Sequence, residues 1–186
     1  MSLVQSTSQP VPAFAGGASA AKRMLDVEVP TQDQTNWCWC AVTLGLRRYY
    51  SQSTITAKQC EIADEVLGVG TACQAPNSVN VMHDLADALG RYGLLASSAL
   101  EGGLSFQEIV NHIDAQRPIG AQVLFLDSGQ GHVLVIRGYR KEGGTEHILI
   151  DDPRFGEDDI PLAQFTQRYR EWGEWTLTYL TRSPSD

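Results

Sequence analysis

The hydrophobic pattern changes its period near the middle of this 186-residue chain. Up to Arg117-Pro118, apolar residues recur at spacings of three and four, which is the period of amphipathic helices. Beyond that point, short runs rich in β-branched residues are separated by clusters of glycine and acidic residues, as in strands joined by turns. Helices that precede strands in this way predict an α+β fold, with the helices segregated from an antiparallel sheet.

Four helices are predicted in the first half of the chain. Their expected N-cap residues, in chain order, are Thr35 or Asn36, Thr56, Ser78 or Asn80, and Ser105. The first helix runs from 37 to about 50, and the third presents Met82 and Leu85 on one face. Ser105 begins the fourth because Glu108, three residues later, completes a capping box.

Strands are predicted over 119–126, 132–139, 146–151 and 174–181, with a short one over 25–30. The acidic run Glu157-Asp158-Asp159 is interpreted as a solvated loop. Residues 1–25 are rich in Ser, Ala, Gly and Pro and offer little to bury, so they are expected to be disordered. Residues 26–182 are expected to form one domain.

Charge and hydropathy exclude some functions. The net charge of −8 argues against nucleic acid as a partner, because phosphate binding needs a basic surface. No apolar run approaches the ~20 residues that cross a bilayer, so no membrane partner is expected. The N-terminus lacks a basic start followed by an apolar stretch, so we expect either a cytoplasmic location or secretion without a cleaved signal peptide. Nothing in the sequence indicates the oligomeric state.

One of the four cysteines is placed to act as a nucleophile. Cys38 opens the first predicted helix, whose N-terminus carries roughly half a positive charge and favours a thiolate. Cys40 lies deeper in the helix. A nucleophilic cysteine needs a base, and of the four histidines His132 fits best, because it follows a glycine-rich loop and opens an apolar strand.

The other three histidines are His83 and His112, within predicted helices, and His147, within a strand. Asp151 and Asp152 end the strand after His132, and strand alternation lets only one of them point at the histidine. An acyl-transfer site also needs oxyanion donors. The backbone N–H of Cys38 is one candidate, and the side-chain amide of Gln32 or Gln34 is the second.

Several segments together carry a resemblance to a known family. They are Gln32 followed by Cys38-Trp39, Gly131-His132 at the start of a strand, and Asp151-Asp152-Pro153 at the end of the next. In this order they resemble papain-like cysteine peptidases, in particular a bacterial branch. That branch includes secreted effector proteases of plant pathogens and the double-glycine leader peptidases of bacteriocin exporters. The resemblance covers roughly residues 27–181.

The resemblance implies a role for each matched residue. Cys38 would be the nucleophile, His132 the general base, Asp152 the orienting acid, and Gln32, whose spacing to Cys38 fits the family, an oxyanion donor. The implied fold is papain-like, with a helical half that carries the cysteine and a sheet that carries His132 and Asp152. The implied activity is hydrolysis of peptide bonds in a protein or peptide substrate through an acyl-thioester, without a metal or cofactor.

The same residues are also compatible with other functions. A transamidase or deamidase would use the same triad. A non-catalytic relative would only bind peptides, and Cys38, Cys40, Cys60 and Cys73 could instead hold zinc. Cys60 and Cys73 are also the best candidates for a disulfide, the alternative being small buried apolar groups.

Two weaker patterns have competing interpretations. Gly16-Gly17 could be a self-cleavage site or part of an ordinary linker. Trp172, Trp175 and Tyr179 could line a substrate cleft or belong to the core.

Overall fold

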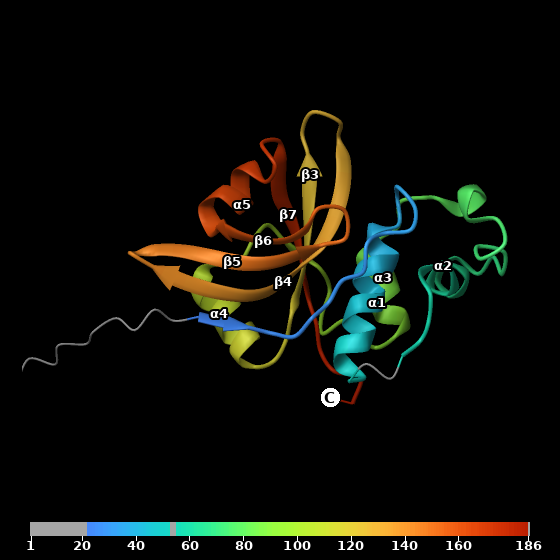
Figure 1. Cartoon of the computed structure of the whole chain (residues 1–186), viewed down its shortest axis with the longest axis horizontal. Helices are drawn as coiled ribbons and strands as arrows, with labels where there is room; N and C mark the ends of the chain where they lie inside the picture. The colour runs from blue at the N-terminus through green and yellow to red at the C-terminus, as the bar shows by residue number, and fades with distance from the viewer. Residues whose placement is uncertain (1–21, 53–54, 186) are drawn as a thin grey trace, which may run out of the picture.

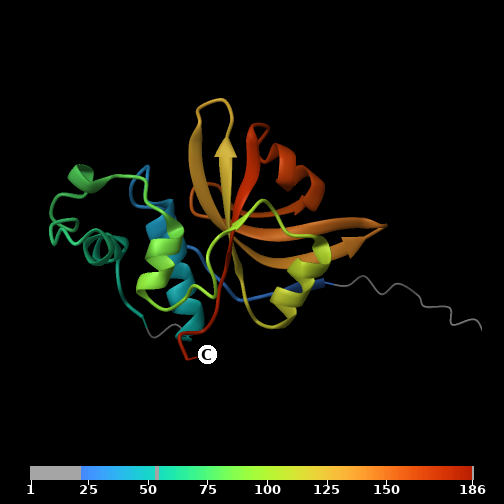
Figure 2. The same cartoon turned by 180° about the vertical axis from the view of Figure 1, so that it is seen from behind.

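A computed structural model of the chain describes residues 22–52 and 55–185. In chain order its elements are β1 (Lys22–Met24), α1 (Cys38–Tyr50), α2 (Gln59–Leu67), the 3₁₀ helix η1 (Pro76–Val79), α3 (Leu85–Arg91), β2 (Leu100–Glu101), α4 (Phe106–Asp114), β3 (Ile119–Phe125), β4 (Gln130–Glu142), β5 (Thr145–Asp152), β6 (Gly156–Pro161), α5 (Leu162–Arg168) and β7 (Gly173–Leu180). Figure 1 and the reverse view in Figure 2 show α1, α2 and α3 on one side of the molecule, while the sheet, α4 and α5 occupy the other. The predicted α+β class is confirmed.

The sheet is antiparallel throughout, in the order β2-β7-β3-β4-β5-β6, and β1 pairs with β4. β4 is its longest strand, with 13 residues. The first half of β4 pairs with β3, which places His132 opposite Val123, and the second half pairs with β5. The sheet, α4 and α5 are together called the β lobe below, and the sheet holds His132 and the end of β5 at the same edge of it.

Helix α1 packs against β4 as well as against α2 and α3 (Figure 1). Its residues from Cys38 to Leu46 are all buried. Gly45 allows the extended segment 25–30 to cross this helix closely, because a Cβ at Gly45 would lie 2.8 Å from the carbonyl oxygen of Glu28. The segment 25–30 thus packs closely along α1 and helps to hold it in place.

The predicted helices exist, but several begin elsewhere. Thr35 and Asn36 do not cap α1, whose N-cap is Trp37; Asn36 and Thr35 instead hydrogen-bond Asn80. α2 starts after Lys58 rather than at Thr56. The bonds of Thr35 and Asn36 to Asn80 are tertiary contacts, which compete with capping and cannot be seen in local sequence.

The third and fourth helices differ in how well they follow the sequence. α3 starts after Asp84, whose side chain accepts from the backbone of Ala86, and Met82 lies outside the helix with an exposed side chain. The expected start at Ser78 or Asn80 is therefore wrong, since Ser78 belongs to η1. The Ser105 capping box on α4 is confirmed.

The four predicted strands of the second half are confirmed as β3, β4, β5 and β7. The interpretation of Glu157-Asp158-Asp159 as a loop is wrong, because these residues form the edge strand β6. Each acidic side chain forms an ion pair with an arginine: Glu157 with Arg137, Asp158 with Arg170, and Asp159 with Arg140. Charged side chains are common on edge strands, where they discourage pairing with other chains.

The start of the folded part also differs from expectation. Residues 25–30 are extended but form no strand, although Leu25, Val27 and Val29 are buried in alternation. β1 lies just before them, within the segment expected to be disordered, because its backbone pairs with β4. Residues 1–21 of the segment expected to be disordered, including Gly16-Gly17, lie outside the described residues.

A disulfide joins Cys60 on α2 to Cys73 in the loop before η1, so the predicted pairing is confirmed. Cys38 and Cys40 are free and buried. With two of its four cysteines joined to each other, the four-cysteine zinc site is not formed.

Removing this disulfide should destabilise the fold. A crosslink that closes a loop of this size is worth about 3 kcal/mol, because it restricts the unfolded chain. We expect the Cys60→Ser/Cys73→Ser variant, and reduced wild-type protein, to lose about that much free energy of unfolding in urea titrations. An unchanged unfolding midpoint after reduction would contradict the disulfide.

Candidate active site

Cys38 is the first residue of α1 and is 2% exposed. The N–H groups of the first helical turn have no acceptor within the helix, and the positive end of the helix dipole lies here. The neighbouring tryptophans fix this helix start in place. The indole N–H of Trp37 donates to Val79 O and that of Trp39 to Val81 O, both at 3.0 Å.

The structure brings His132 into contact with both Cys38 and Asp152. Nε2 of His132 lies 2.9 Å from Oδ1 of Asp152, which leaves Nδ1 as the ring nitrogen for the Cys38 side chain. Burial lowers the pKa of His132, but hydrogen bonds and charge from Asp152 and Cys38 outweigh burial and raise this pKa to about 9. The imidazole is therefore protonated at neutral pH and places a cation beside the sulfur.

Both carboxylate oxygens of Asp152 accept hydrogen bonds from other groups of the protein. Its Oδ1 also accepts from the backbone N–H of Arg154 at 2.7 Å and of Phe155 at 3.0 Å, and its Oδ2 accepts from the hydroxyl of Tyr169 at 2.8 Å. Burial raises the pKa of this carboxyl, but His132 and the other donors outweigh burial and keep the pKa below its usual range. The acid is thus oriented on both sides and kept ionised.

Asp151 points the other way, as strand alternation requires. Its Oδ2 accepts from the backbone N–H of Val29 at 2.7 Å. Burial raises the pKa of this carboxyl. Of the two candidate acids, the structure places Asp152 beside His132 and uses Asp151 to bind the segment that crosses α1.

We expect Tyr169→Phe to lower kcat about tenfold and leave KM unchanged, because one hydrogen bond to a charged group is lost while the ring still fills its buried site. Tyr169 acts as a positioning residue for Asp152. The matched control is Tyr139→Phe, which removes a hydroxyl bound to Asp114, away from the site. Equal effects of both variants on kcat would show that Tyr169 has only a structural role.

Gln32 lies close to this site, but its amide is already engaged. Nε2 donates to Gln34 O at 2.8 Å and to Thr35 O at 2.7 Å, and among the described residues Oε1 is buried without a partner. The backbone N–H of Gln32 donates to Pro153 O at 2.9 Å, which ties this loop to the end of β5. To donate to an oxyanion, Gln32 must release one of its two side-chain bonds.

A hollow of about 690 Å³ lies between this loop and the β lobe. It is lined by residues 31–36 together with Gln130, Pro153 and Arg154. Its two walls meet where Gln130 Nε2 donates to Asn36 Oδ1 at 3.4 Å. Gln34, the alternative oxyanion donor, lines this hollow, and its carbonyl oxygen binds Gln32.

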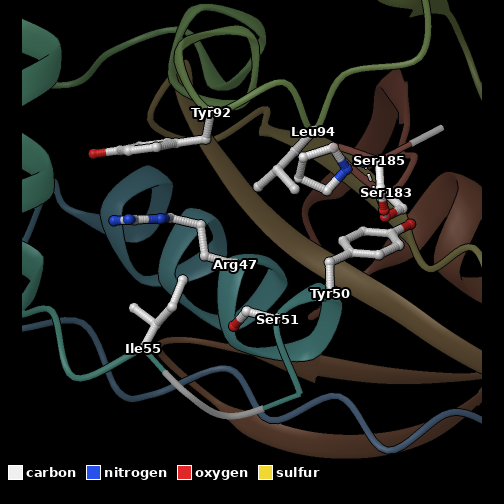
Figure 3. A pocket seen from close by; sticks show the side chains of 9 residues that line it. Arg47, Tyr50, Ser51, Ile55, Tyr92, Leu94, Ser183 and Ser185 are labelled. Atoms are coloured by element: carbon white, nitrogen blue, oxygen red, sulfur yellow. Dashed lines mark hydrogen bonds between the residues drawn. The ribbon is translucent and has the colours of Figure 1, made fainter.

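The hollow drawn in Figure 3 lies elsewhere. It is formed at the far end of α1, where the guanidinium of Arg47 stacks 3.9 Å from the ring centre of Tyr92. At 1.5 Å per helical residue, Arg47 lies roughly 14 Å along α1 from Cys38. This hollow is therefore not part of the Cys38 site.

The other histidines have different partners. His83 packs on the ring of Trp39 and lies 3.5 Å from Asp87, and Nδ1 of His147 lies 2.8 Å from Asp159. Burial lowers the pKa of His112 on α4. Across residues 22–52 and 55–185, no cluster of three or more His, Cys, Asp or Glu is arranged to hold a metal ion.

Tyr169, Gln59 and Asn80 support the site, a role that the sequence did not indicate; Asn80 was expected to cap a helix. Gln59 holds the loop before Cys38, since its amide accepts from Asp33 N and donates to Thr31 O. Each of the three acts through tertiary contacts at long sequence separation, and no local motif marks them. Of the three aromatic residues proposed for a cleft or the core, Trp175 and Tyr179 are buried in the core and Trp172 is exposed.

Comparisons with known proteins give one family and several related folds. A family model described as the Peptidase_C39 like family matches residues 24–176. No curated protein matches the sequence. Among solved structures, procathepsin L 3 from the larval midgut of Tenebrio molitor is 11% identical with a TM-score of 0.50, covering 83% of this chain and 66% of its own.

A chain from the structure of the mite allergens Blo t 1 and Der p 1 is 10% identical with a TM-score of 0.53, covering 94% of this chain and 75% of its own. The Pseudomonas avirulence protein AvrPphB is 14% identical with a TM-score of 0.40, covering 84% of this chain and 98% of its own. This chain spans just under two thirds of the procathepsin chain. At these identities the likeness to procathepsin L 3 and to the mite allergen chain concerns the fold alone.

Proposed function

Since this chain belongs to the Peptidase_C39 like family and has the fold of papain-like cysteine peptidases, we propose that it hydrolyses peptide bonds at Cys38. The observation that carries this assignment is the contact of one buried imidazole with Cys38 on one side and Asp152 on the other. This is the nucleophile, base and orienting acid that acyl transfer requires.

The first half of the reaction forms the acyl-enzyme. The Cys38 thiolate attacks the substrate carbonyl carbon, a C–S bond forms, and the carbonyl oxygen becomes an oxyanion. When this intermediate collapses, the C–N bond breaks and the leaving nitrogen takes the proton from Nδ1 of His132. Asp152 keeps the ring in the orientation that makes this transfer possible.

The second half releases the product acid. His132, now neutral, takes a proton from water, and the resulting hydroxide attacks the thioester carbonyl. The C–S bond then breaks and the thiolate returns, again beside a protonated imidazole. Each proton taken by His132 in one step is delivered in the other, so the cycle closes without a cofactor.

The oxyanion would be held by two donors. The backbone N–H of Cys38 lies at the free end of α1, and the amide of Gln32 belongs to the loop just before it. One such donor contributes about 3–4 kcal/mol to the transition state in other acyl-transfer enzymes. Because both amide hydrogens of Gln32 bind carbonyl oxygens in this conformation, substrate has to displace Gln34 O or Thr35 O.

Incubation with a defined mixture of peptides tests the assignment. Hydrolysis creates new N-termini that mass spectrometry detects, and the Cys38→Ala variant should produce none of them. A deamidase would instead convert glutamine side chains to acids, and a transamidase would attach an added amine, with the backbone left intact. Either of these products without backbone cleavage would overturn the peptidase assignment in favour of that alternative.

We infer that the enzyme works as a bacterial effector or processing protease, as the sequence resemblance implies. The Cys60–Cys73 disulfide favours the secreted alternative, because disulfides persist in oxidising compartments. Among the helices of the described residues, none has the length and apolar character that crossing a membrane requires.

A further inference from the structure

A third hollow, of about 440 Å³, lies on the β lobe. Its wall includes Phe125, Asp127, Arg154, Phe155, Arg170 and Trp172. Trp172 is 56% exposed and Phe155 41%, although both are large aromatic side chains. Exposed aromatic side chains gathered around one hollow are typical of a binding surface.

This hollow adjoins the proposed catalytic histidine. The ring of Phe155 meets that of His132 edge to face, with centroids 6.1 Å apart, and Phe125 lies 6.2 Å from it on another side. The turn that carries Arg154 and Phe155 is held by Asp152, which accepts both of their backbone N–H groups. The hollow is therefore built onto the histidine and its acid, not onto the cysteine helix.

This position defines which part of a substrate the hollow can receive. In the proposed reaction His132 gives its proton to the leaving nitrogen, so the leaving part of the peptide must begin at His132. The residues that follow the cleaved bond then lie over the wall on the histidine side. Side chains of this hollow would contact them directly.

The charges in the hollow point to one kind of ligand. Arg170 is paired with Asp158 at 3.2 Å, whereas Arg154 forms no ion pair among the described residues. The guanidinium of Arg154 lies 5.2 Å from the ring centre of Phe155, and Arg154 lines both this hollow and the one beside Gln32. Asp127 and Asp33 are the acidic residues on the rims of the two hollows.

We propose that Arg154 determines specificity by binding a carboxylate on the leaving side of the substrate. A guanidinium against an aromatic ring is well suited to bind a carboxylate through paired hydrogen bonds. The carboxylate belongs either to an Asp or Glu side chain close to the cleaved bond or to the free C-terminus of a short leaving peptide. This inference rests on the peptidase function proposed above.

Cleavage of a mixture of peptides of known sequence tests the proposal. We expect wild-type enzyme to favour Asp or Glu after the cleaved bond, Arg154→Gln to lose about tenfold of that preference, and Arg154→Glu to favour Lys or Arg instead. Comparison of the best-cut peptide as free acid and as C-terminal amide identifies the source of the carboxylate. The matched control is Arg117→Glu, which makes the same change of charge at an exposed arginine outside both hollows.

The same preference in wild type and Arg154→Glu, or no acidic preference in wild type, would overturn the proposal. A second measurement separates this failure from failure of the peptidase function. Iodoacetate carries a carboxylate and iodoacetamide does not. The rate at which iodoacetate alkylates Cys38, divided by the rate for iodoacetamide, should therefore fall in Arg154→Gln but not in Arg117→Gln. If wild-type enzyme cuts no peptide, the proposed function fails and this ratio alone decides whether Arg154 binds carboxylates.

Discussion

Replacing Cys38 with alanine should abolish peptide hydrolysis, with a fall in kcat on the order of 10⁶-fold. The acyl-thioester cannot form without the sulfur, and no other group in the site can take its place. The substitution removes one buried atom at the start of α1, so the fold should persist. Steady-state kinetics on a cleaved peptide, with circular dichroism to confirm the fold, measures both.

Cys40 offers the matched control. It is buried in the same helix, two residues further on, and burial, with smaller contributions from Cys38 and Asp33, strongly raises the pKa of its thiol. A thiol of this kind stays protonated and unreactive. Cys40→Ala should therefore retain hydrolysis, and loss of activity in that variant with activity retained in Cys38→Ala would exchange the roles of the two cysteines.

Asp152→Ala should lower kcat on the order of 10³-fold. Among the described residues Asp152 is the one carboxylate partner of His132, so the ring loses this partner and its fixed orientation. Because the alanine also leaves Tyr169 and two backbone N–H groups without an acceptor, at about 1–3 kcal/mol each, the rate must be measured on protein shown to be folded. Asp152→Asn, which keeps the shape and removes the charge, should show the same direction of change with less loss of stability.

The pH profile separates positioning from general destabilisation. Activity requires protonated His132, so in the wild type it should fall as pH rises through about 9. Asp152→Asn removes the charge of Asp152, which raises the pKa of His132 against the effect of burial, so this alkaline limb should move to lower pH in that variant. Asp151→Asn should leave the limb in place, since Asp151 binds Val29; a shift in Asp151→Asn alone would make Asp151 the orienting acid.

Local sequence identified the parts of this site that lie next to recognisable elements. A cysteine at a helix start, a histidine at a strand start and an Asp-Pro at a strand end can each be read from a few neighbouring residues. The structure brings Cys38, His132 and Asp152 together. Strand alternation predicted that only one of the two aspartates would face the histidine, and the structure shows which.

The parts that escaped prediction depend on contacts between distant segments. Tyr169 hydrogen-bonds Asp152 from a distant part of the chain. The proposed role of Arg154 depends on the hollow that it lines, which forms only when the chain folds. The engagement of Gln32 by two backbone carbonyls depends on the conformation of one loop, which spacing alone does not define. The spacing to Cys38 indicated that Gln32 could donate to an oxyanion, but not whether its side-chain N–H groups are free to do so.

In the fold, too, the elements defined by local sequence were predicted, and those that depend on contacts between distant segments were not. Strands with strong alternation and a helix with a capping box lie where the sequence placed them. The edge strand β6 was missed because its acidic residues lack apolar alternation, and its stability comes from pairing with β5 and from arginines on other segments. The cap of α1 was misplaced because Thr35 and Asn36 bond to Asn80 instead. The start of α2 was placed at Thr56, whereas its N-cap is Lys58.

The most direct test of an activated Cys38–His132 pair is labelling with an epoxide probe for thiol peptidases, with the modified residue mapped by mass spectrometry. Fast labelling at Cys38 in the wild type, much slower labelling in His132→Ala, and none at Cys38 in Cys38→Ala is the predicted result. Labelling at Cys40, or labelling at Cys38 at the same rate with and without His132, would contradict the catalytic pair.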